Sequence, residues 1–258
     1  MTDMGGWEKV FAYCERGTSA LFWAEPFNAL SNGAFFVSAI FATSLLASQV
    51  GSSRRVVEWT LVALLFLIGF GSFLFHTYAT RWASVADTAP IGVFMLAYLG
   101  YAVRRFLGAS WVLTLVSLVT FVAAMRAVEL MPCSGNLMPF TAAAERPCLN
   151  GSRAYLPALA ALLIVGAVLL WRRHGASWFV LGAGVVFAVS LGFRTVDFEF
   201  CASTELFGRV RGTHAVWHVL NALVLYLLLR AAIIFGGGVD EGDFATRSGR
   251  ATGIIRWS

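Results

Sequence analysis

The amino-acid sequence predicts an all-α fold, a bundle of seven transmembrane helices with the N-terminus outside and the C-terminus in the cytoplasm. Hydrophobic residues make up 59% of the 258 positions and charged residues only 13%, whereas in soluble domains about a quarter of all residues are charged. Seven apolar runs approach the length of a membrane span, and arginine pairs occur in every second connection between them. Because no linker rich in proline or glycine interrupts them, we expect one membrane domain over 1–238 and a polar tail over 239–258.

The individual helices follow from the lengths of the apolar runs. Crossing ~30 Å of hydrocarbon takes about 20 helical residues, with a lower limit of about 17. Some runs are near that limit, and Arg104, Arg172 and Arg194 can snorkel at their ends. The predicted helices cover residues 27–48, 57–76, 88–103, 109–126, 155–171, 177–193 and 214–235.

The orientation follows from the distribution of arginine. Short cytoplasmic loops are enriched in basic residues, and the tight pairs here are Arg54-Arg55, Arg104-Arg105 and Arg172-Arg173. The connections at 126–153 and 194–213 also contain arginine, but acidic residues accompany it. The paired arginines form no continuous basic face, so the net charge of +5 does not indicate nucleic-acid binding. We expect a multi-pass membrane protein in contact with membrane lipids, and no protein partner is predicted.

Polar residues at membrane depth are costly and usually functional. In this sequence they gather near the outer ends of the predicted helices. Isolated polar residues with no common role would not favour one side so consistently. The set is Glu25, Asn28, Ser31, Asn32, Ser72, His76, Asp87, Arg126, Glu129, Arg194, Asp197, His214, His218 and Asn221.

Three of the four histidines have the pattern of a metal site. His214 and His218 are four residues apart, so both side chains project from one helical face. His76 lies at the same predicted depth and supplies a third imidazole. A catalytic zinc ion takes three protein ligands and leaves its fourth position to water. His174 lies next to a cytoplasmic arginine pair, where we expect a solvated loop residue.

Two further residues extend this interpretation towards catalysis. Ser72 is four residues before His76, on the same helical face, and Asp87 follows His76 by eleven residues, where a tight turn would lead into the next helix. A carboxylate there can orient a histidine or accept the proton of a metal-bound water. Two histidines at this spacing, taken alone, more often serve packing. It is the addition of His76, Ser72 and Asp87 at one depth that favours a metal site.

Other polar and aromatic residues have less specific interpretations. Glu25, Asn28 and Asn32 form a stripe that serves either hydrogen bonding between helices or function, and the sequence favours neither. Trp217, between the two histidines, is expected to be interfacial packing.

At this point the motifs resemble those of the alkaline ceramidases, a family of seven-helix membrane hydrolases whose superfamily includes the adiponectin receptors. The similarity runs in order over roughly 13–235. The matching blocks are CE at 14–15, EPFNALSN at 25–32, GSFLFH at 71–76, DTAP at 87–90, DFEFC at 197–201 and HAVWH at 214–218.

The resemblance implies hydrolysis of the amide bond of ceramide to a sphingoid base and a fatty acid, with a ceramide-like lipid as substrate. It implies that His76, His214 and His218 bind Zn²⁺ and that Ser72 and Asp87 support the chemistry. The active site would then face the extracytoplasmic side. Two other functions stay open: an ester hydrolase acting on a phospholipid or lipid anchor, and a receptor-like protein in which zinc is structural.

The sequence departs from the family pattern at a second metal site. The resemblance implies a Ca²⁺ site near the CE pair, and Glu15 and Glu25 are its remaining candidate ligands. Ala12 and Gly17 stand where the pattern has oxygen-bearing side chains, and Arg16 adds an opposing charge. Calcium takes six to eight oxygen ligands, so these changes argue against it.

The four cysteines all fall in segments predicted to lie outside, where disulfides form. We predict two disulfides, Cys14–Cys201 and Cys133–Cys148. The family resemblance supports the first pair, because both cysteines lie in matching blocks. The second pair follows from its position within one loop.

Overall fold

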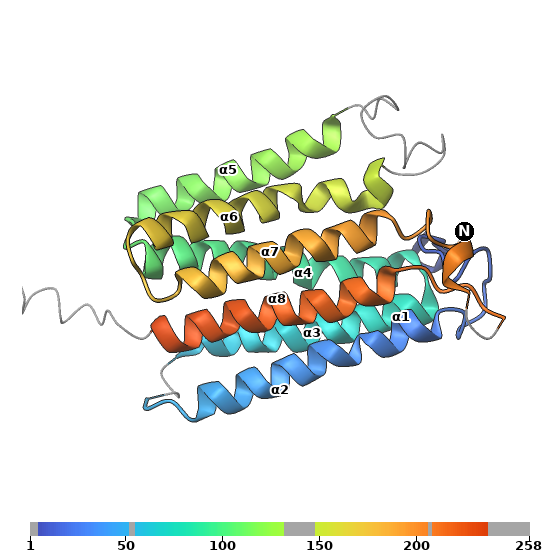
Figure 1. Cartoon of the computed structure of the whole chain (residues 1–258), viewed down its shortest axis with the longest axis horizontal. Coiled ribbons are helices and arrows are strands. Elements are labelled where there is room, and N and C mark those ends of the chain that lie inside the picture. Colours follow the sequence, from blue (N-terminus) through green and yellow to red (C-terminus); the bar gives the residue numbers. More distant parts are fainter. Residues whose placement is uncertain (1–4, 52–54, 132–147, 206–207, 237–258) are drawn as a thin grey trace, which may run out of the picture.

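The computed structural model describes residues 5–51, 55–131, 148–205 and 208–236. Within these residues the chain contains no strand and has seven helical spans long and apolar enough to cross a membrane. They lie side by side in one elongated bundle (Figure 1). The helices are α1 (Pro26–Ser31), α2 (Gly33–Ala47), α3 (Val56–Tyr78), α4 (Arg81–Tyr101), α5 (Trp111–Leu130), α6 (Leu156–Trp171), α7 (Ser177–Thr195) and α8 (His214–Phe235).

Short helical segments extend or connect these elements. α1 and α2 meet at Asn32 and together form the first span. A π-helical turn, η3 (Ala102–Phe106), continues α4, and a 3₁₀ segment, η4 (Cys148–Tyr155), precedes α6. Two more 3₁₀ turns, η1 (Gly5–Trp7) and η5 (Ala202–Thr204), lie in the N-terminal segment and in the α7–α8 connection.

The seven predicted spans are confirmed, but two boundaries move. The third span begins at Arg81 and not at 88, because Ala79 adopts a left-handed conformation that turns the chain sharply after α3. Asp87 therefore lies in the second turn of α4 and does not open the helix. The fourth span continues to Leu130, and its Arg126 and Glu129 pair with each other on the exposed surface, 3.0 Å apart. They do not belong to the polar set at the site.

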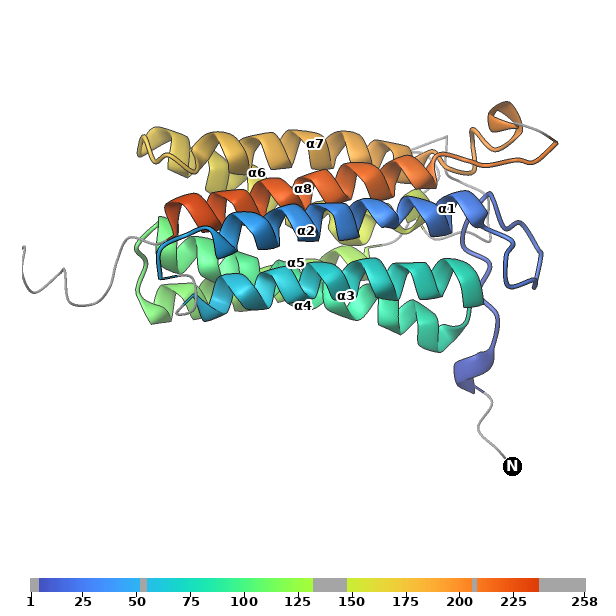
Figure 2. The same ribbon diagram turned by 90° about the horizontal axis from the view of Figure 1, so that it is seen from below.

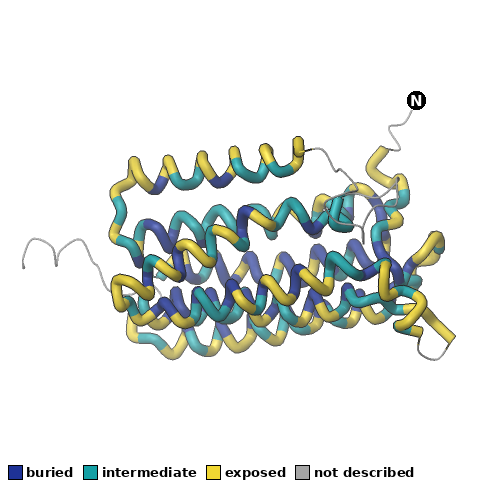
Figure 3. Tube along the Cα trace, turned by 45° about the horizontal axis from the view of Figure 1, so that its top comes forward, coloured by how far each residue is buried: buried dark blue, intermediate teal, exposed yellow. Residues whose placement is uncertain are grey.

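α3 and α8 form the centre of the bundle. α3 packs against α2, α4 and α8, and α8 packs against α2, α3 and α7. α5 is at the periphery and buries only Thr114 and Phe121, so most of its surface is exposed (Figure 3). Such apolar exposure is expected for a face in contact with lipid.

The two ends of the bundle differ in chemistry. Because the spans alternate in direction, Arg55, Arg104-Arg105 and Arg172-Arg173 lie at the end where α8 finishes, opposite the starts of α1 and α8 (Figures 1 and 2). Arg55 at the start of α3 donates to the carbonyl oxygens of Ala232 and Ile233 at 3.0 and 2.8 Å, and so caps α8. The orientation of the two ends relative to the membrane stays a prediction.

The N-terminal segment is attached to the opposite end of the bundle. The predicted disulfide between Cys14 and Cys201 is confirmed and joins this segment to the α7–α8 connection, with 5.7 Å between the Cα atoms. Cys148 is also disulfide-bonded, whereas Cys133, its predicted partner, lies outside the described residues. The predicted tail, 239–258, lies outside them as well.

Candidate metal centre

The three predicted histidines meet inside the bundle. His76 comes from the last turns of α3, and His214 and His218 come from the first two turns of α8. All three are buried, and their candidate ligand atoms lie within 4.8 Å of one another. The ring centroids are 4.6 Å apart for His214 and His218 and 4.7 Å apart for His76 and His218. The helical spacing therefore brings both α8 histidines to one point facing α3.

Glu25 orients His76. Its Oε2 atom lies 2.6 Å from Nδ1 of His76 and accepts the Nδ1 proton. The Nε2 atom of His76 is buried and has no hydrogen-bond partner. A histidine held in this way presents an unprotonated Nε2 atom to a metal ion.

Ser31 fixes His218 by the same logic. The Ser31 hydroxyl donates to the carbonyl oxygen of Asn28 at 2.8 Å, so towards His218 it acts as an acceptor. It lies 2.7 Å from Nδ1 of His218. Nδ1 therefore carries the proton, and Nε2 is left as the ligand atom. Glu25 and Ser31, at the start of the first span, thus support His76 and His218. Asn28 in turn hydrogen-bonds both Glu25 and Ser31.

Asp197 and Tyr13 position His214. One Asp197 oxygen accepts from the backbone amides of Thr213 and His214, at 2.7 and 2.9 Å, and the other accepts from the amide of Cys14 at 2.9 Å. Burial raises the pKa of Asp197, although these amides favour its charged form. The Tyr13 ring stacks on His214 with 3.6 Å between centroids. The first turn of α8 is thereby tied to the disulfide-linked N-terminal segment.

Ser72 and Asp87 lie beside the histidines. Both are buried, and the Ser72 side chain lies close enough to interact with the Asp87 carboxylate. Gly71 makes this approach of α3 and α4 achievable, because a side chain there would collide with the carbonyl oxygen of Ala86. The two predicted catalytic residues are therefore adjacent to each other as well as to His76.

The cluster fits a metal ion. His76 Nε2 and His214 Nδ1 are buried polar atoms without partners, which is costly unless something else satisfies them. Three neutral imidazoles suit a transition-metal ion. Within the part of the chain that the structure describes, no other histidine, cysteine or carboxylate completes this group.

The calcium candidates have a different environment. The two Glu15 oxygens accept from the backbone amides of Phe27 and Asn28, both at 2.8 Å, and burial raises the pKa of Glu15. The Glu25 carboxylate forms an ion pair with Arg16. With every carboxylate oxygen bonded to a protein donor and a guanidinium already present, these residues do not fit calcium.

His174 lies at the other end of the bundle and takes no part in the centre. We predicted a solvated loop residue, and this was only partly correct. Its ring is half-buried, 5.3 Å from the Phe106 ring, and its Nδ1 atom accepts from the Ala176 amide at 3.1 Å. Burial lowers the pKa of His174.

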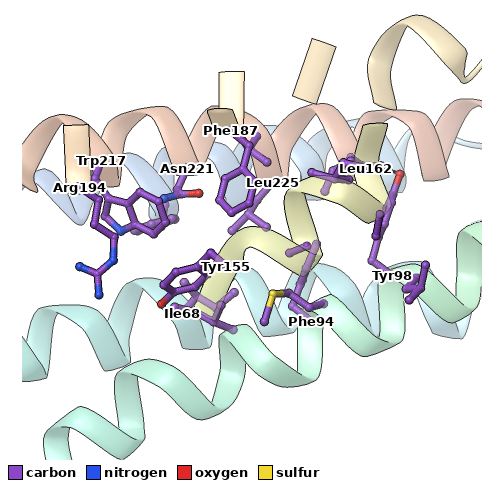
Figure 4. A pocket seen from close by; sticks show the side chains of 18 of the residues that line it. Ile68, Phe94, Tyr98, Tyr155, Leu162, Phe187, Arg194, Trp217, Asn221 and Leu225 are labelled. Atoms are coloured by element: carbon purple, nitrogen blue, oxygen red, sulfur yellow. Dashed lines mark hydrogen bonds between the residues drawn. The ribbon is translucent and has the colours of Figure 1, made fainter. Parts of the chain in front are cut away.

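A long pocket leads away from the centre into the bundle (Figure 4). His214, Ser72 and Asp87 line one end of it. Ala102, another lining residue, lies fifteen positions further along the α4–η3 helix than Asp87, which corresponds to about 22 Å at 1.5 Å per residue. The space of this pocket that no atom fills, including the part open to the surroundings, is about 1050 Å³, and its walls below the polar end are mostly aliphatic and aromatic.

The polar end of the pocket contains a residue whose role the sequence did not reveal. We predicted that Arg194 can snorkel at its helix end and counted it in the polar set at the outer ends of the helices; its guanidinium lies in the pocket wall. Its Cζ atom is 5.5 Å from each of the ring centroids of Tyr13, Tyr155 and Trp217. Figure 4 shows Arg194 beside Trp217 at one end of the pocket. Trp217, predicted to be interfacial packing, is buried in the same wall. An arginine at a helix end has the same sequence pattern whether its guanidinium lies at the membrane interface or in a pocket wall. Residue spacing therefore could not distinguish these two positions.

Comparison of the sequence with models of known protein families and with curated proteins found no match. The resemblance to alkaline ceramidases is therefore limited to the quoted motifs.

Proposed function

We propose that this protein is a zinc-dependent lipid amidase that hydrolyses the N-acyl bond of a ceramide-like lipid to a sphingoid base and a free fatty acid. One observation carries the proposal: a three-histidine cluster with an adjacent Ser72–Asp87 pair opens onto an apolar pocket whose lining extends about 22 Å along the α4–η3 helix. On the predicted orientation, the site faces the extracytoplasmic side.

The ligand set favours a catalytic over a structural metal. Structural zinc sites usually have four protein ligands, whereas catalytic sites have three and an open position. Within the described residues the group consists of three histidines. A zinc ion held by them would lower the pKa of a bound water to about 7 and polarise the substrate carbonyl.

The residues of the chain would complete the reaction. Asp87 accepts the proton released as the water oxygen attacks the amide carbon, and it returns that proton to the nitrogen as the carbon–nitrogen bond breaks. Ser72, which interacts with the Asp87 carboxylate, would help to hold it in place. Glu25 and Ser31 keep His76 and His218 in the tautomer that binds a metal.

The pocket supports a long-chain lipid as substrate. Burying each methylene contributes about 0.8 kcal/mol, and the lining below the polar end offers side chains such as Phe94, Leu162 and Val165 to an acyl chain. The metal-side end would hold the amide, with Arg194 nearby as a donor for polar groups of the head group.

Incubation of the purified protein with mixed ceramides and phospholipids in vesicles, followed by mass spectrometry, tests the proposal. We expect a sphingoid base and a fatty acid from ceramide, abolished by Asp87→Asn and retained in Ser44→Ala, which alters an exposed serine of α2. Lysophospholipid without ceramide cleavage would make the protein an esterase. If zinc is bound but neither lipid class is cleaved, the receptor-like alternative gains and the amidase proposal fails.

A further inference from the structure

Arg16 lies enclosed among the segments that support the metal centre. Its side chain has no exposed surface. Its Nε atom donates to Oε1 of Glu25, and Nη2 donates to the carbonyl oxygens of His76 and Thr77 at 2.9 and 3.2 Å. Nη1 donates to the carbonyl oxygens of Leu21 and Ser19 at 2.8 and 3.2 Å. All three guanidinium nitrogens are therefore in use.

These contacts place a positive charge at the end of α3. The carbonyls of His76 and Thr77 are in the last turn of that helix, where carbonyl groups lack intrahelical partners and the helix dipole is negative. A planar guanidinium satisfies several such acceptors at once, which the compact ammonium group of lysine cannot do in the same geometry. Arg16 thus caps the helix that carries His76.

The same guanidinium acts on the His76 side chain through Glu25. One Glu25 oxygen pairs with Arg16, and the other lies 2.6 Å from Nδ1 of His76 and 3.0 Å from Nδ2 of Asn28. Removal of Arg16 would leave the buried Glu25 carboxylate without its cationic partner. Glu25 would then no longer be held in the position from which it fixes the His76 tautomer.

We propose that Arg16 is the positioning cation of the metal centre. It holds Glu25 and the end of α3 in place, where the family resemblance implies a calcium ion. The proposal rests on the metal site of the proposed function. The two Glu15 oxygens are occupied by backbone amides, and Ala12 and Gly17 offer no side-chain oxygen. A calcium ion beside the guanidinium would add repulsion, and it would lack the six to eight oxygens that it needs. The chain carries this charge covalently, so calcium has no role in its stability or zinc binding.

The first test is calcium dependence in the full-length protein, purified in detergent with calcium-free buffers and loaded with zinc. The thermal unfolding temperature and zinc affinity are measured with and without added CaCl₂, with MgCl₂ as the control salt. A calcium chelator is avoided because it would also remove zinc. We expect no difference between the calcium and magnesium samples. A rise in unfolding temperature that is specific to calcium would overturn the proposal.

The second test uses Arg16→Ala, Arg16→Lys and the matched control Arg153→Ala. Arg153 lies in η4 at the same end of the bundle and also donates to two backbone carbonyls, those of Glu129 and Met131, but it is away from the histidines. We expect zinc affinity to fall about 10- to 100-fold in Arg16→Ala, the usual effect of losing a residue that orients a metal ligand. Arg16→Lys should be intermediate and Arg153→Ala unchanged.

Cobalt substitution gives a readout that loss of stability alone does not produce. The visible spectrum of bound Co²⁺ reports ligand geometry, and we expect it to change in the Arg16 variants but not in Arg153→Ala. If Arg16→Ala does not fold, Arg16→Lys decides the question: wild-type zinc affinity and an unchanged cobalt spectrum in that variant would contradict the proposal. None of these measurements uses a lipid, so results that contradict the role of Arg16 would not contradict the proposed amidase activity. Conversely, a protein that binds zinc but does not cleave ceramide would contradict the amidase proposal and not the role of Arg16.

Discussion

The ring of Tyr13 lies almost parallel to that of His214, at 20° and with 3.6 Å between centroids. Tyr13 precedes the first span, whereas His214 begins the last one, so the stacking closes the N-terminal segment over the metal centre. Burial raises the pKa of Tyr13, so its phenol stays neutral at physiological pH. The contact therefore depends on the aromatic ring and not on a charge.

This stacking predicts a difference between two Tyr13 variants. Tyr13→Phe keeps the ring and should bind zinc as the wild type does. Tyr13→Ala removes it and should weaken zinc binding about tenfold, since support residues typically contribute 10–100-fold to metal affinity. A competition titration with a chromophoric chelator measures the effect, and equal affinities for the two variants would contradict the proposed role of the ring.

The three histidines should each be needed for metal. His76→Ala, His214→Ala and His218→Ala are expected to lose most of the bound zinc, because a catalytic zinc site with two protein ligands is rarely stable. His174→Ala, at the opposite end of the bundle, should retain it. Elemental analysis of the purified variants measures the content. Full zinc occupancy in all three site variants would remove the basis of the proposed function.

Ser72 and Asp87 should matter more for turnover than for metal binding. Ser72→Ala and Asp87→Asn are expected to lower the rate of ceramide hydrolysis by about 10²-fold or more, the usual contribution of a general base or its support. Their zinc content should stay near that of the wild type. Ser117→Ala, a partly exposed position on the peripheral helix α5, is the control. Loss of zinc in Asp87→Asn would instead identify Asp87 as a metal ligand or its support.

The pocket should set the acyl-chain preference. Val165 lines it from α6, whereas the neighbouring Ile164 is exposed on the outer surface of the same helix. Val165→Phe fills part of the pocket, so kcat/KM should fall about tenfold or more for long-chain ceramides and less for short-chain ones. Ile164→Phe should not change the ratio. Equal losses for all chain lengths in Val165→Phe would place the acyl chain elsewhere.

The Cys14–Cys201 disulfide should stabilise the site end of the bundle. Peptide mapping without reduction should recover the peptide that joins these two cysteines. Removing the bond in a Cys14→Ser/Cys201→Ser variant should cost about 2–5 kcal/mol and lower the unfolding temperature by several degrees. It should also weaken zinc binding, because Asp197 contacts both Cys14 and His214. Four alkylatable thiols in the unreduced protein would contradict the bond and weaken the predicted orientation.

The sequence by itself determined the seven spans and the main members of the site. Apolar length predicts helices in lipid because each backbone group must be satisfied within its own segment. Helical periodicity predicted that His214 and His218 share one face. The positions of His76, Ser72 and Asp87 near the ends of their spans predicted that these residues lie at the same membrane depth as the two histidines. The Cys14–Cys201 pair was also anticipated, with support from the matching motifs.

Only the tertiary structure decided which residues support the site and how. Periodicity indicates which residues share a face but not which helix that face meets, so the Ser31–His218 contact and the Gly71–Ala86 approach were hidden. The start of the third span depended on the turn at Ala79, which has no glycine or proline to mark it. The sequence showed Arg16 only as a charge opposing calcium, and it placed Arg194 in the polar set without indicating its partners. A buried arginine is stable only when acceptors and rings from distant segments surround its guanidinium, and those partners come together only in the folded chain.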